Sequence, residues 1–427
     1  MRTIKVHVCC VAALMSIFWV AASAFAAEPA KTDTVILKPG STIAIVGESA
    51  TAQMRYSRYL EAYLLACGPD LKLKVIQFGR EGESAPGFLA RMDADVMLFN
   101  PDYVTICYGM QDGRGAPYND SIGKTYESAL RSIVQKLKDK GSTAIVATPG
   151  CVDSEIFKDK SYYNETLKTL GEIARKIAAD YSMPVAEVHS VMAEAMKKAK
   201  AACGNTYYMT GPEGSYPARN GHLTMAYALL KAMGFDGNIG TLTVDFEGKA
   251  EGDKSHTITS FRDGRLEVES SRYPFCFMDQ TTTPGGTKGI LPFLPFNQDL
   301  NRFTLIVKHL PAAKAEIQWG TEKKIFDKAQ LETGINLAAE FLDNPFVPRF
   351  SALLNLLEVK QTYESQLARG LLPNLPLIVK EDKNDAATVE LVEAFKKKLM
   401  DIERVSQAKA AASIVPIKHR IDITPIK

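Results

Sequence analysis

The sequence lacks a strong excess of charge of either sign. Its 51 lysine and arginine residues nearly balance 49 aspartate and glutamate residues, which gives a formal net charge of +2 over 427 residues. A charge this close to zero gives no electrostatic reason to expect nucleic acid or an anionic membrane surface as a partner. We therefore expect no nucleic-acid partner and look for function in individual sites.

Metal-binding motifs are missing as well. There is no Cys-x-x-Cys pair, no His-Glu-x-x-His and no acidic calcium-binding loop. No internal repeat or low-complexity tract stands out. The sequence therefore predicts no metal and no cofactor. Its apolar content of 46% and charged content of 23% are those of a globular protein, and its length predicts two or three domains.

An apolar segment lies at the N-terminus. Two cations in Met1–Lys5 precede the apolar run Val6–Phe25, which ends in small residues. This pattern is typical of a signal peptide cleaved after Ala26. The alternative, a transmembrane anchor, requires a longer apolar core. We expect residues 1–26 to be a signal peptide, residues 27–40 to be a linker, and the mature protein to be periplasmic or extracellular without an integral membrane span.

Cysteine is scarce in the expected mature chain, which keeps Cys67, Cys107, Cys151, Cys203 and Cys276. Because this number is odd, at least one thiol must stay free or pair between chains in an oxidising compartment. Cys107 lies inside an apolar run, where a buried free thiol is expected. Cys151 and Cys203 both fall in predicted loops, so a Cys151–Cys203 disulfide is our hypothesis for one pair.

Between Ser41 and Phe235, short β-branched runs alternate with amphipathic stretches of helical length. The predicted strands are Thr42–Val46, Leu73–Phe78, Tyr103–Tyr108, Thr143–Ala147 and Pro184–Val188. The helical patterns are Met54–Ala66, Ala85–Leu98, Tyr126–Lys140, Asn164–Tyr181, His189–Ala202 and His222–Met233. For residues 41–236 this alternation predicts a flavodoxin-like three-layer α/β/α domain with a mainly parallel five-stranded sheet. Ligands of such sheets bind beyond the carboxyl ends of the strands.

Beyond residue 236 the pattern of apolar and polar residues changes. Threonine-rich alternation with glycine and proline turns predicts a small antiparallel β-rich module over residues 237–345. Residues 346–427 are predicted to be helical, with one helix over Phe350–Ala368 and another beginning near Asp385. The second helix has an apolar face, which we expect to pack on the protein's own core and not on a partner or membrane. That face consists of Val392, Phe395, Leu399 and Ile402.

One serine lies where a strand is expected to meet a helix. The first predicted strand ends in IVGESAT, Ile45–Thr51, and leads directly into a helical pattern. This places Ser49 on a tight turn at a helix N-terminus, where backbone N–H groups point at whatever binds. A serine before a helix is also a common N-cap. The segment alone leaves both interpretations open.

Four segments together resemble the conserved blocks of SGNH (GDSL-type) hydrolases. GESAT resembles the GDS-x-T block of that family, and Gly82 in REGES matches the glycine of the second block. YGMQD, Tyr108–Asp112, is similar to the third block, normally Gly-x-Asn-Asp. EGSYPARNGH, Glu213–His222, is similar to the last block, normally Asp-x-x-His-Pro followed by Gly-His. The resemblance extends from about Thr42 to Gly234.

The resemblance implies a role for each matched residue. Ser49 takes the position of the nucleophile that attacks an ester carbonyl. Its own N–H, the N–H of Gly82 and the side chain of Gln111 take the positions of the oxyanion hole. Glu213 and Tyr216 stand at the positions of the triad aspartate and histidine.

Four of the matched positions depart from the family pattern. Glu48 replaces the first-block aspartate, Gln111 replaces the oxyanion asparagine, and Glu213 replaces the triad aspartate. Each of these three side chains is longer by one methylene, whereas catalytic donors must lie within about 0.5 Å of productive placement. A tyrosine normally titrates near pH 10, so Tyr216 is a poor replacement for a histidine base near neutral pH. A neighbouring carboxylate would disfavour a phenolate further.

No other histidine replaces the missing base convincingly in the sequence. His189 follows the fifth predicted strand, where a lone histidine is more often structural. His222 matches the non-catalytic histidine of the Gly-His pair. The remaining histidines beyond residue 237 are His256, His309 and His419. A further alternative is that Glu48 and Glu213 form a carboxylate pair like that of a glycosidase. The simpler interpretation is that both are solvated carboxylates at helix ends.

Two functions therefore remain open. The first is an exported carboxylic ester hydrolase, similar to the carbohydrate deacylases of the family and impaired by Tyr216. The second is a non-catalytic pseudo-esterase that binds a glycan or acyl ligand in the retained cleft. We expect a small-molecule or glycan ester as the ligand, although the second function predicts no particular one. Neither function specifies an oligomeric state.

Overall fold

The computed structural model describes residues 34–279, 285–383 and 385–426. Within them, a five-stranded sheet has the order β2-β1-β3-β4-β5, and every neighbouring pair is parallel. Its strands are β1 (Thr42–Gly47), β2 (Lys74–Gln77), β3 (Tyr103–Cys107), β4 (Thr143–Ala147) and β5 (Val185–Ala186). This is the strand order of a flavodoxin-like doubly wound sheet. The predicted signal peptide and residues 27–33 of the predicted linker lie outside the described residues.

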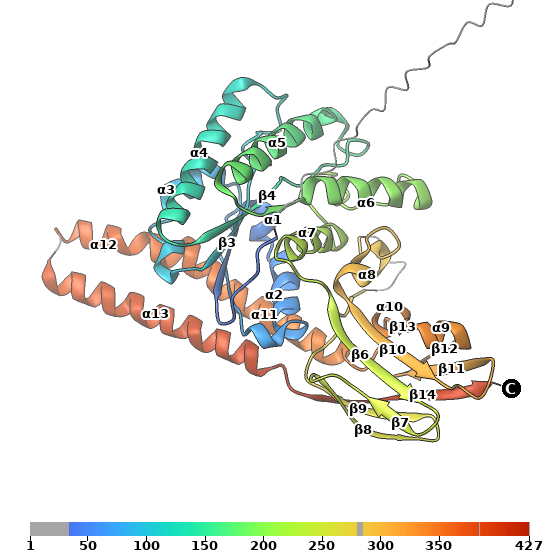
Figure 1. The fold of residues 1–427 in the computed structure, drawn as a ribbon. Helices are drawn as coiled ribbons and strands as arrows, with labels where there is room; N and C mark the ends of the chain where they lie inside the picture. The colour runs from blue at the N-terminus through green and yellow to red at the C-terminus, as the bar shows by residue number, and fades with distance from the viewer. Residues whose placement is uncertain (1–33, 280–284, 384, 427) are drawn as a thin grey trace, which may run out of the picture. The chain divides into compact units, whose positions relative to one another are not determined.

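Both faces of this sheet are buried under helices, as Figure 1 shows. Ile43 and Ile45 of β1 enter one apolar cluster and Ala44 and Val46 enter another, because alternate strand residues point to opposite faces. The first face is covered by α2 (Tyr56–Ala66), α6 (Val188–Cys203) and α7 (Arg219–Ala232). The second is covered by α3 (Ala85–Arg91), α4 (Asp120–Asp139) and α5 (Tyr163–Tyr181). The predicted three-layer α/β/α fold is confirmed.

The stretch predicted as one helix over Ala85–Leu98 is divided. Helix α3 ends at Arg91, and a separate 3-10 turn covers Val96–Phe99. The buried guanidinium of Arg91 donates to the two carboxylate oxygens of Glu83 at 2.6 and 2.7 Å and also pairs with Asp95. Asp95 accepts the N–H of Val96 at 2.5 Å and so caps the new turn. The single-helix prediction was wrong because these buried ionic contacts interrupt the helical path.

The β-rich part consists of two further sheets. One has the order β13-β10-β6-β7 and the other β12-β11-β14-β9-β8. The first contains β6 (Asn238–Asp245), β7 (Lys249–Glu251), β10 (Arg302–Lys308) and β13 (Ile335–Asn336). The second contains β8 (His256–Arg262), β9 (Arg265–Ser270), β11 (Lys314–Trp319), β12 (Glu322–Asp327) and β14 (Ile417–Ile426). The expectation of a purely antiparallel module was wrong, because β6 and β10 pair in parallel.

Side chains from the two sheets pack against one another. The ring of Phe303 on β10 lies 5.8 Å from that of Trp319 on β11 and 6.2 Å from that of His419 on β14, measured between centroids. Leucine and valine side chains of β6, β9 and β10 join the same apolar cluster. The two sheets therefore form a small sandwich, and its interior is continuous with the apolar cluster on the first face of the β1–β5 sheet.

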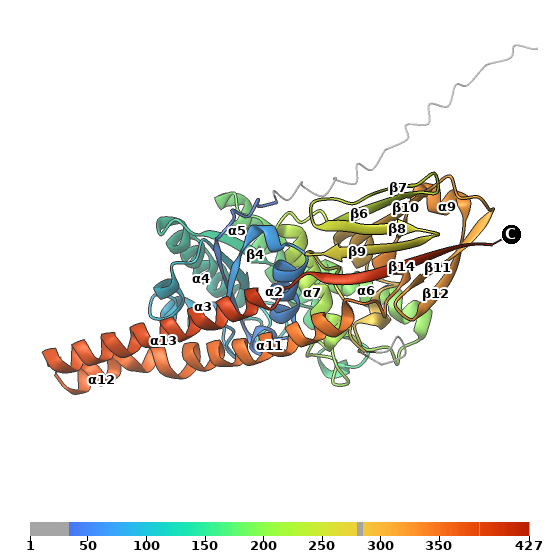
Figure 2. The ribbon, with the colours of Figure 1, turned by 90° about the horizontal axis from the view of Figure 1, so that it is seen from below.

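The C-terminal region begins with helices. The helices are α11 (Val347–Gln366), α12 (Leu375–Glu381) and α13 (Ala386–Ala412), and α11 and α13 lie side by side in Figure 2. The predicted apolar face of α13 is only half correct. Val392 and Leu399 are buried, whereas Phe395 and Ile402 are exposed by 46% and 43%.

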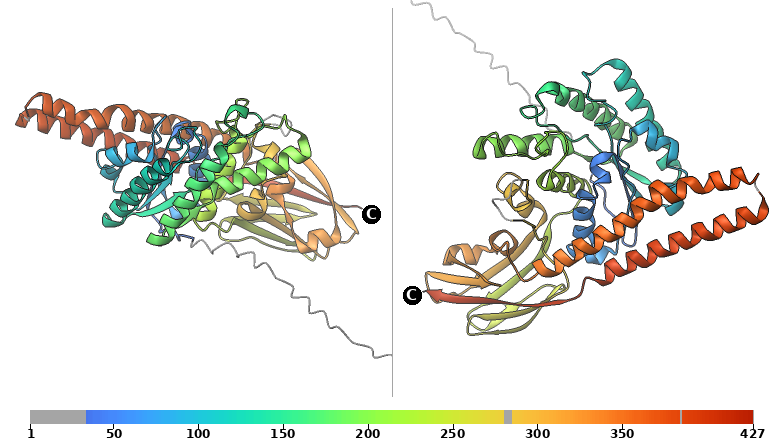
Figure 3. Two further views of the ribbon diagram at one scale, coloured as in Figure 1. Left: turned by 90° about the horizontal axis from the view of Figure 1, so that it is seen from above. Right: turned by 180° about the vertical axis from the view of Figure 1, so that it is seen from behind.

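The chain ends in a strand, although residues 346–427 were expected to be helical. After α13 the chain returns to the sandwich as β14, between β9 and β11, as the right-hand view of Figure 3 shows. Ile421 and Ile423 point inward and alternate with half-buried Asp422 and exposed Arg420 and Thr424. This alternation with a period of two is typical of a strand. The expectation that the whole C-terminal region is helical was therefore wrong for these last residues.

The predicted Cys151–Cys203 disulfide is wrong. Cys151 is buried, Cys203 is exposed, and both are free thiols. The expectation of a buried free thiol at Cys107 is confirmed. In the part of the chain that the structure describes, no helix is both long and apolar enough to cross a bilayer.

Candidate active site around Ser49

Ser49 is the first residue of the short helix α1 (Ser49–Ala52), directly beyond the carboxyl end of β1. The turn requires a glycine before it. A Cβ on Gly47 would lie 2.1 Å from the hydroxyl oxygen of Thr51 and 2.7 Å from the carbonyl oxygen of Cys107. Close packing of β1, α1 and β3 therefore fixes the position from which the Ser49 side chain emerges.

Gly82 lies beside the serine, as its match to the second block predicts. Its backbone N–H donates a hydrogen bond to Ser49 Oγ at 3.0 Å. Gly82 has a φ of +68°, a backbone conformation that glycine adopts without steric cost. This N–H is therefore available at the point where an ester oxygen would approach Ser49.

Glu48 connects the serine turn to the loop after β3. Its two carboxylate oxygens accept the backbone N–H groups of Met110 at 2.8 Å and Gln111 at 2.5 Å. Burial and the nearby Asp112 carboxylate raise the pKa of Glu48 to about 8, although the two N–H bonds act in the opposite direction. Glu48 thus positions the backbone of Gln111 and does not touch the Ser49 hydroxyl.

A cavity of about 180 Å³ opens next to Ser49. Its walls include Glu48, Gln111 and Tyr216, so the structure brings three of the sequence-predicted site residues around the nucleophile position. Gln111 and Tyr216 are both exposed, Tyr216 by 48%. Gly82 reaches the site through its hydrogen bond to Ser49.

Glu213 is separated from this cavity. It is exposed and lines a neighbouring cavity of about 430 Å³, which Tyr216 and Pro217 also border. The alternative of a Glu48–Glu213 carboxylate pair in one site therefore finds no support. Glu213 occupies the sequence position of the triad aspartate, but it does not share a cavity with Ser49.

The histidines near the site have other partners. His189 Nδ1 lies 3.1 Å from the carbonyl oxygen of Gly150, and burial lowers the pKa of this imidazole. His222 Nε2 lies 3.0 Å from Gln53 Oε1, and burial followed by the charge of Arg55 lowers its pKa to about 3. Both rings are therefore neutral at neutral pH. Among the residues that the structure describes, no histidine contacts the Ser49 hydroxyl.

Several side chains that line the cavity were not anticipated from the sequence. The predicted blocks account for one wall, and the others carry apolar and sulfur-containing side chains from the end of β3, from the loop after β4 and from α5, α6 and α7. These include Cys107, Cys151, Val152, Phe157, Tyr163, Met192 and Met225. Burial raises the pKa of Cys151 to about 12, so this thiol is protonated and unreactive. The sequence offered one indication of these cavity residues: the loop after β4 follows the carboxyl end of a strand, where ligands of such sheets bind.

Comparison with known proteins agrees with this geometry. The profile of the GDSL-like Lipase/Acylhydrolase family matches residues 41–219. An acetylxylan esterase from Geobacillus stearothermophilus is 24% identical over 188 residues, which cover 42% of this chain and 81% of the relative. The region that the profile matches contains β1 to β5, the first three sequence blocks and the fourth block as far as Arg219.

A solved structure is similar in fold over most of the chain. A gut microbial diltiazem-metabolizing enzyme superposes with a TM-score of 0.70 at 19% identity, over 92% of this chain and 99% of its own. A crystal structure of the Geobacillus stearothermophilus acetylxylan esterase covers 47% of this chain and 97% of its own, with 23% identity and a TM-score of 0.41. The first similarity includes the sandwich and the C-terminal helices. Residues 41–219 therefore form a GDSL-like lipase/acylhydrolase (SGNH) domain, as their sequence blocks predict.

Proposed function

We propose that the protein is an exported member of this family that binds acyl esters of carbohydrates at Ser49 and hydrolyses them slowly or not at all. The observation that carries the proposal is the set of contacts around Ser49. The hydroxyl has the Gly82 N–H beside it and a cavity in front of it. No histidine is bonded to the hydroxyl in the described part of the chain.

Retention of ester binding is supported by the shape and chemistry of the cavity. About 180 Å³ bordered by methionine, cysteine, valine and aromatic side chains suits a short acyl group. The Gly82 N–H, which donates to Ser49 Oγ, and the side chain of Gln111, which lines the cavity, are donors that an ester oxygen could use. The acetylxylan esterase relative suggests acetylated carbohydrate as the first ligand to examine.

Weak turnover is supported by the chemistry of the replaced base. A serine hydroxyl needs a proton acceptor within hydrogen-bond reach before it attacks a carbonyl. A tyrosine hydroxyl normally keeps its proton near neutral pH, and Tyr216 borders the cavity where the family places its histidine. General acid–base assistance contributes about 10² to 10⁴-fold to catalysis, so its loss leaves little activity.

The test compares three proteins on short-chain aryl esters and acetylated xylo-oligosaccharides: wild type, Ser49→Ala and Tyr216→His. We expect at most trace Ser49-dependent turnover by the wild type, and for Tyr216→His a kcat/KM at least about 10²-fold above the wild-type value or detection limit. Tyr208→His is the matched control, because Tyr208 borders the neighbouring cavity but not that of Ser49. Efficient wild-type turnover that Ser49→Ala abolishes would show a working hydrolase instead.

Binding is measured separately from turnover. Calorimetric titration of Ser49→Ala with acetylated and deacetylated xylo-oligosaccharides is expected to show tighter binding of the acetylated form. Equal affinity for the two forms would contradict an acyl-binding cavity, whatever the hydrolysis assays show. Export is tested by expressing the full chain in a bacterial host with a secretion pathway and locating the processed product.

A further inference from the structure

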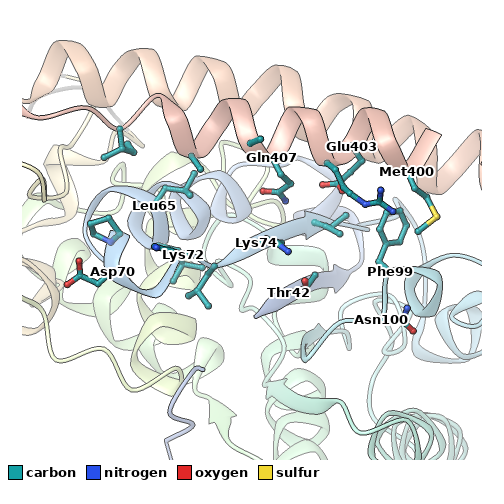
Figure 4. A pocket seen from close by; sticks show the side chains of 18 of the residues that line it. Thr42, Leu65, Asp70, Lys72, Lys74, Phe99, Asn100, Met400, Glu403 and Gln407 are labelled. Atoms are coloured by element: carbon teal, nitrogen blue, oxygen red, sulfur yellow. The ribbon is translucent and has the colours of Figure 1, made fainter. Parts of the chain in front are cut away.

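A second and larger cavity lies along the outer edge of β2. It has a volume of about 830 Å³ and shares no lining residue with the Ser49 cavity. One wall is α13, and the other is formed by β2, the end of α2 and the turn Pro69–Leu71. Figure 4 shows Glu403 and Gln407 on the α13 wall, with Leu65, Lys72 and Lys74 on the opposite wall. We call this cavity the β2–α13 groove.

The floor of the β2–α13 groove is apolar. Apolar side chains from four segments converge on it, and the segment that includes α13 is far from the other three in sequence. They are Leu64, Leu65, Leu73, Ile76, Leu98, Phe99, Met400, Ala408, Ala411 and Ile414. A volume of about 830 Å³ lies in the range of pockets that enclose ligands of drug or lipid size.

The charged groups of the groove are predominantly cationic. Lys72 and Lys74 line it, both are exposed, and neither has an ion pair with any residue that the structure describes. Arg404 also lines it, and its pairing with Asp401 is on the exposed side of α13. The groove thus offers two unpaired ammonium groups next to an apolar floor.

The two acidic residues of the groove do not cancel this charge. Asp70 is already paired with Lys254 at 2.7 Å and Arg272 at 2.8 Å. Glu403 is only 3% exposed and so presents almost no surface to the groove, and burial raises its pKa. Its Oε1 atom is buried and has no hydrogen-bond partner among the described residues.

We propose that the β2–α13 groove binds a single-chain amphiphile with an anionic head, such as an alkyl carboxylate. The alkyl chain lies on the apolar floor, and the carboxylate contacts the ammonium groups of Lys72 and Lys74. A neutral chain loses the charge contacts, and a cationic head meets like charge. This site is independent of the Ser49 cavity and of any ester hydrolysis there.

The test uses sodium dodecanoate below its micellar concentration as the probe, titrated into the full-length mature protein by calorimetry. Dodecanol and dodecyltrimethylammonium are the neutral and cationic comparisons. We expect one dodecanoate per chain, with affinity that falls as salt is raised, and weaker binding of both comparison compounds. Absence of dodecanoate binding at millimolar concentration, or equal binding of the cationic amphiphile, would overturn the proposal.

Two pairs of variants locate the site. Ala408→Trp fills the groove from an exposed position on α13, whereas Ala412→Trp adds the same ring to an exposed position on that helix outside the groove. Lys72→Gln with Lys74→Gln removes the unpaired ammonium groups. Lys397→Gln with Lys409→Gln removes two exposed lysines of α13 that do not line the groove.

The expected pattern separates binding in the groove from binding elsewhere. Ala408→Trp is expected to abolish dodecanoate binding, and the Lys72/Lys74 variant to weaken it about tenfold. Both control variants are expected to bind as the wild type does. Wild-type affinity of a folded Ala408→Trp protein, verified by circular dichroism and thermal unfolding, would refute the location.

Discussion

Substitution of Lys360 should strongly disturb the packing of the C-terminal helices on the α/β domain. Its side chain is 1% exposed on α11, and its ammonium group contacts Glu364 Oε1 at 2.6 Å, Glu61 Oε1 at 2.8 Å and the carbonyl oxygen of Val75 at 2.7 Å. The network thus joins α11 to α2 and to the edge strand β2. We predict that Lys360→Met destabilises the protein by about 3 kcal/mol.

The magnitude follows from the charges that the substitution leaves behind. Removing one partner of a buried ion pair costs about 3–5 kcal/mol, because the other charge remains buried without compensation. Burial raises the pKa of Glu364 to about 8, so this carboxyl is largely protonated at pH 7. Glu61 is therefore the one carboxylate left without its cation, and it keeps a bond from Gln361 Nε2 at 2.8 Å. We accordingly expect the lower end of the range.

The assay is urea unfolding at pH 7 followed by far-UV circular dichroism. Lys396→Met is the matched control, because Lys396 forms an exposed pair with Glu393 on α13 and its loss should cost less than about 1 kcal/mol. Adding Glu61→Gln to Lys360→Met should recover most of the lost stability, since no buried charge then remains unpaired. A loss below about 1 kcal/mol for Lys360→Met, or no recovery in the double variant, would refute the reasoning.

Three further predictions concern protonation, the oxyanion position and the thiols. Burial raises the pKa values of Glu48 and Glu364 to about 8, so the folded protein keeps protons that the unfolded chain releases near pH 4.5. Their contribution to stability is therefore complete below about pH 4.5 and is lost as the pH rises through about 8. Glu364→Gln should flatten the fall in the urea midpoint between pH 6 and 9, and an unchanged slope would contradict this assignment. In the Tyr216→His background, Gln111→Asn should raise kcat/KM about tenfold or more, because the shorter amide restores the family's donor placement; an unchanged or lower value would contradict that role. Among the described cysteines, only Cys203 is exposed, so a thiol reagent should modify it rapidly and the others only on unfolding, as mass spectrometry of peptides would show.

The α/β domain was predictable from sequence because its signals are local. Apolar runs buried on both faces and separated by amphipathic stretches define β1 to β5, and the segment Ile45–Thr51 places Ser49 at the end of β1. Gly82 was found only through the family resemblance, since nothing local about a glycine indicates that its N–H meets a serine 33 residues away.

The remaining differences arise from contacts between distant segments. The parallel pairing of β6 with β10 and the insertion of β14 between β9 and β11 depend on neighbours far along the chain. The buried Lys360 resembles a surface lysine in the sequence, because its partners Glu61 and Val75 lie almost 300 residues away. The separation of Glu213 from the Ser49 cavity follows from loop geometry that a sequence block cannot specify.

The most direct measurement of the central claim is the reactivity of Ser49 itself. A fluorophosphonate reagent modifies a serine whose hydroxyl is activated by a base, and intact-protein mass spectrometry with peptide mapping identifies the modified residue. We predict that wild-type Ser49 remains unmodified under conditions in which Tyr216→His is labelled at Ser49, with Tyr216→His/Ser49→Ala as the negative control. Rapid labelling of Ser49 in the wild-type protein would contradict the account, because it would demonstrate a base that Tyr216 and the described histidines do not supply.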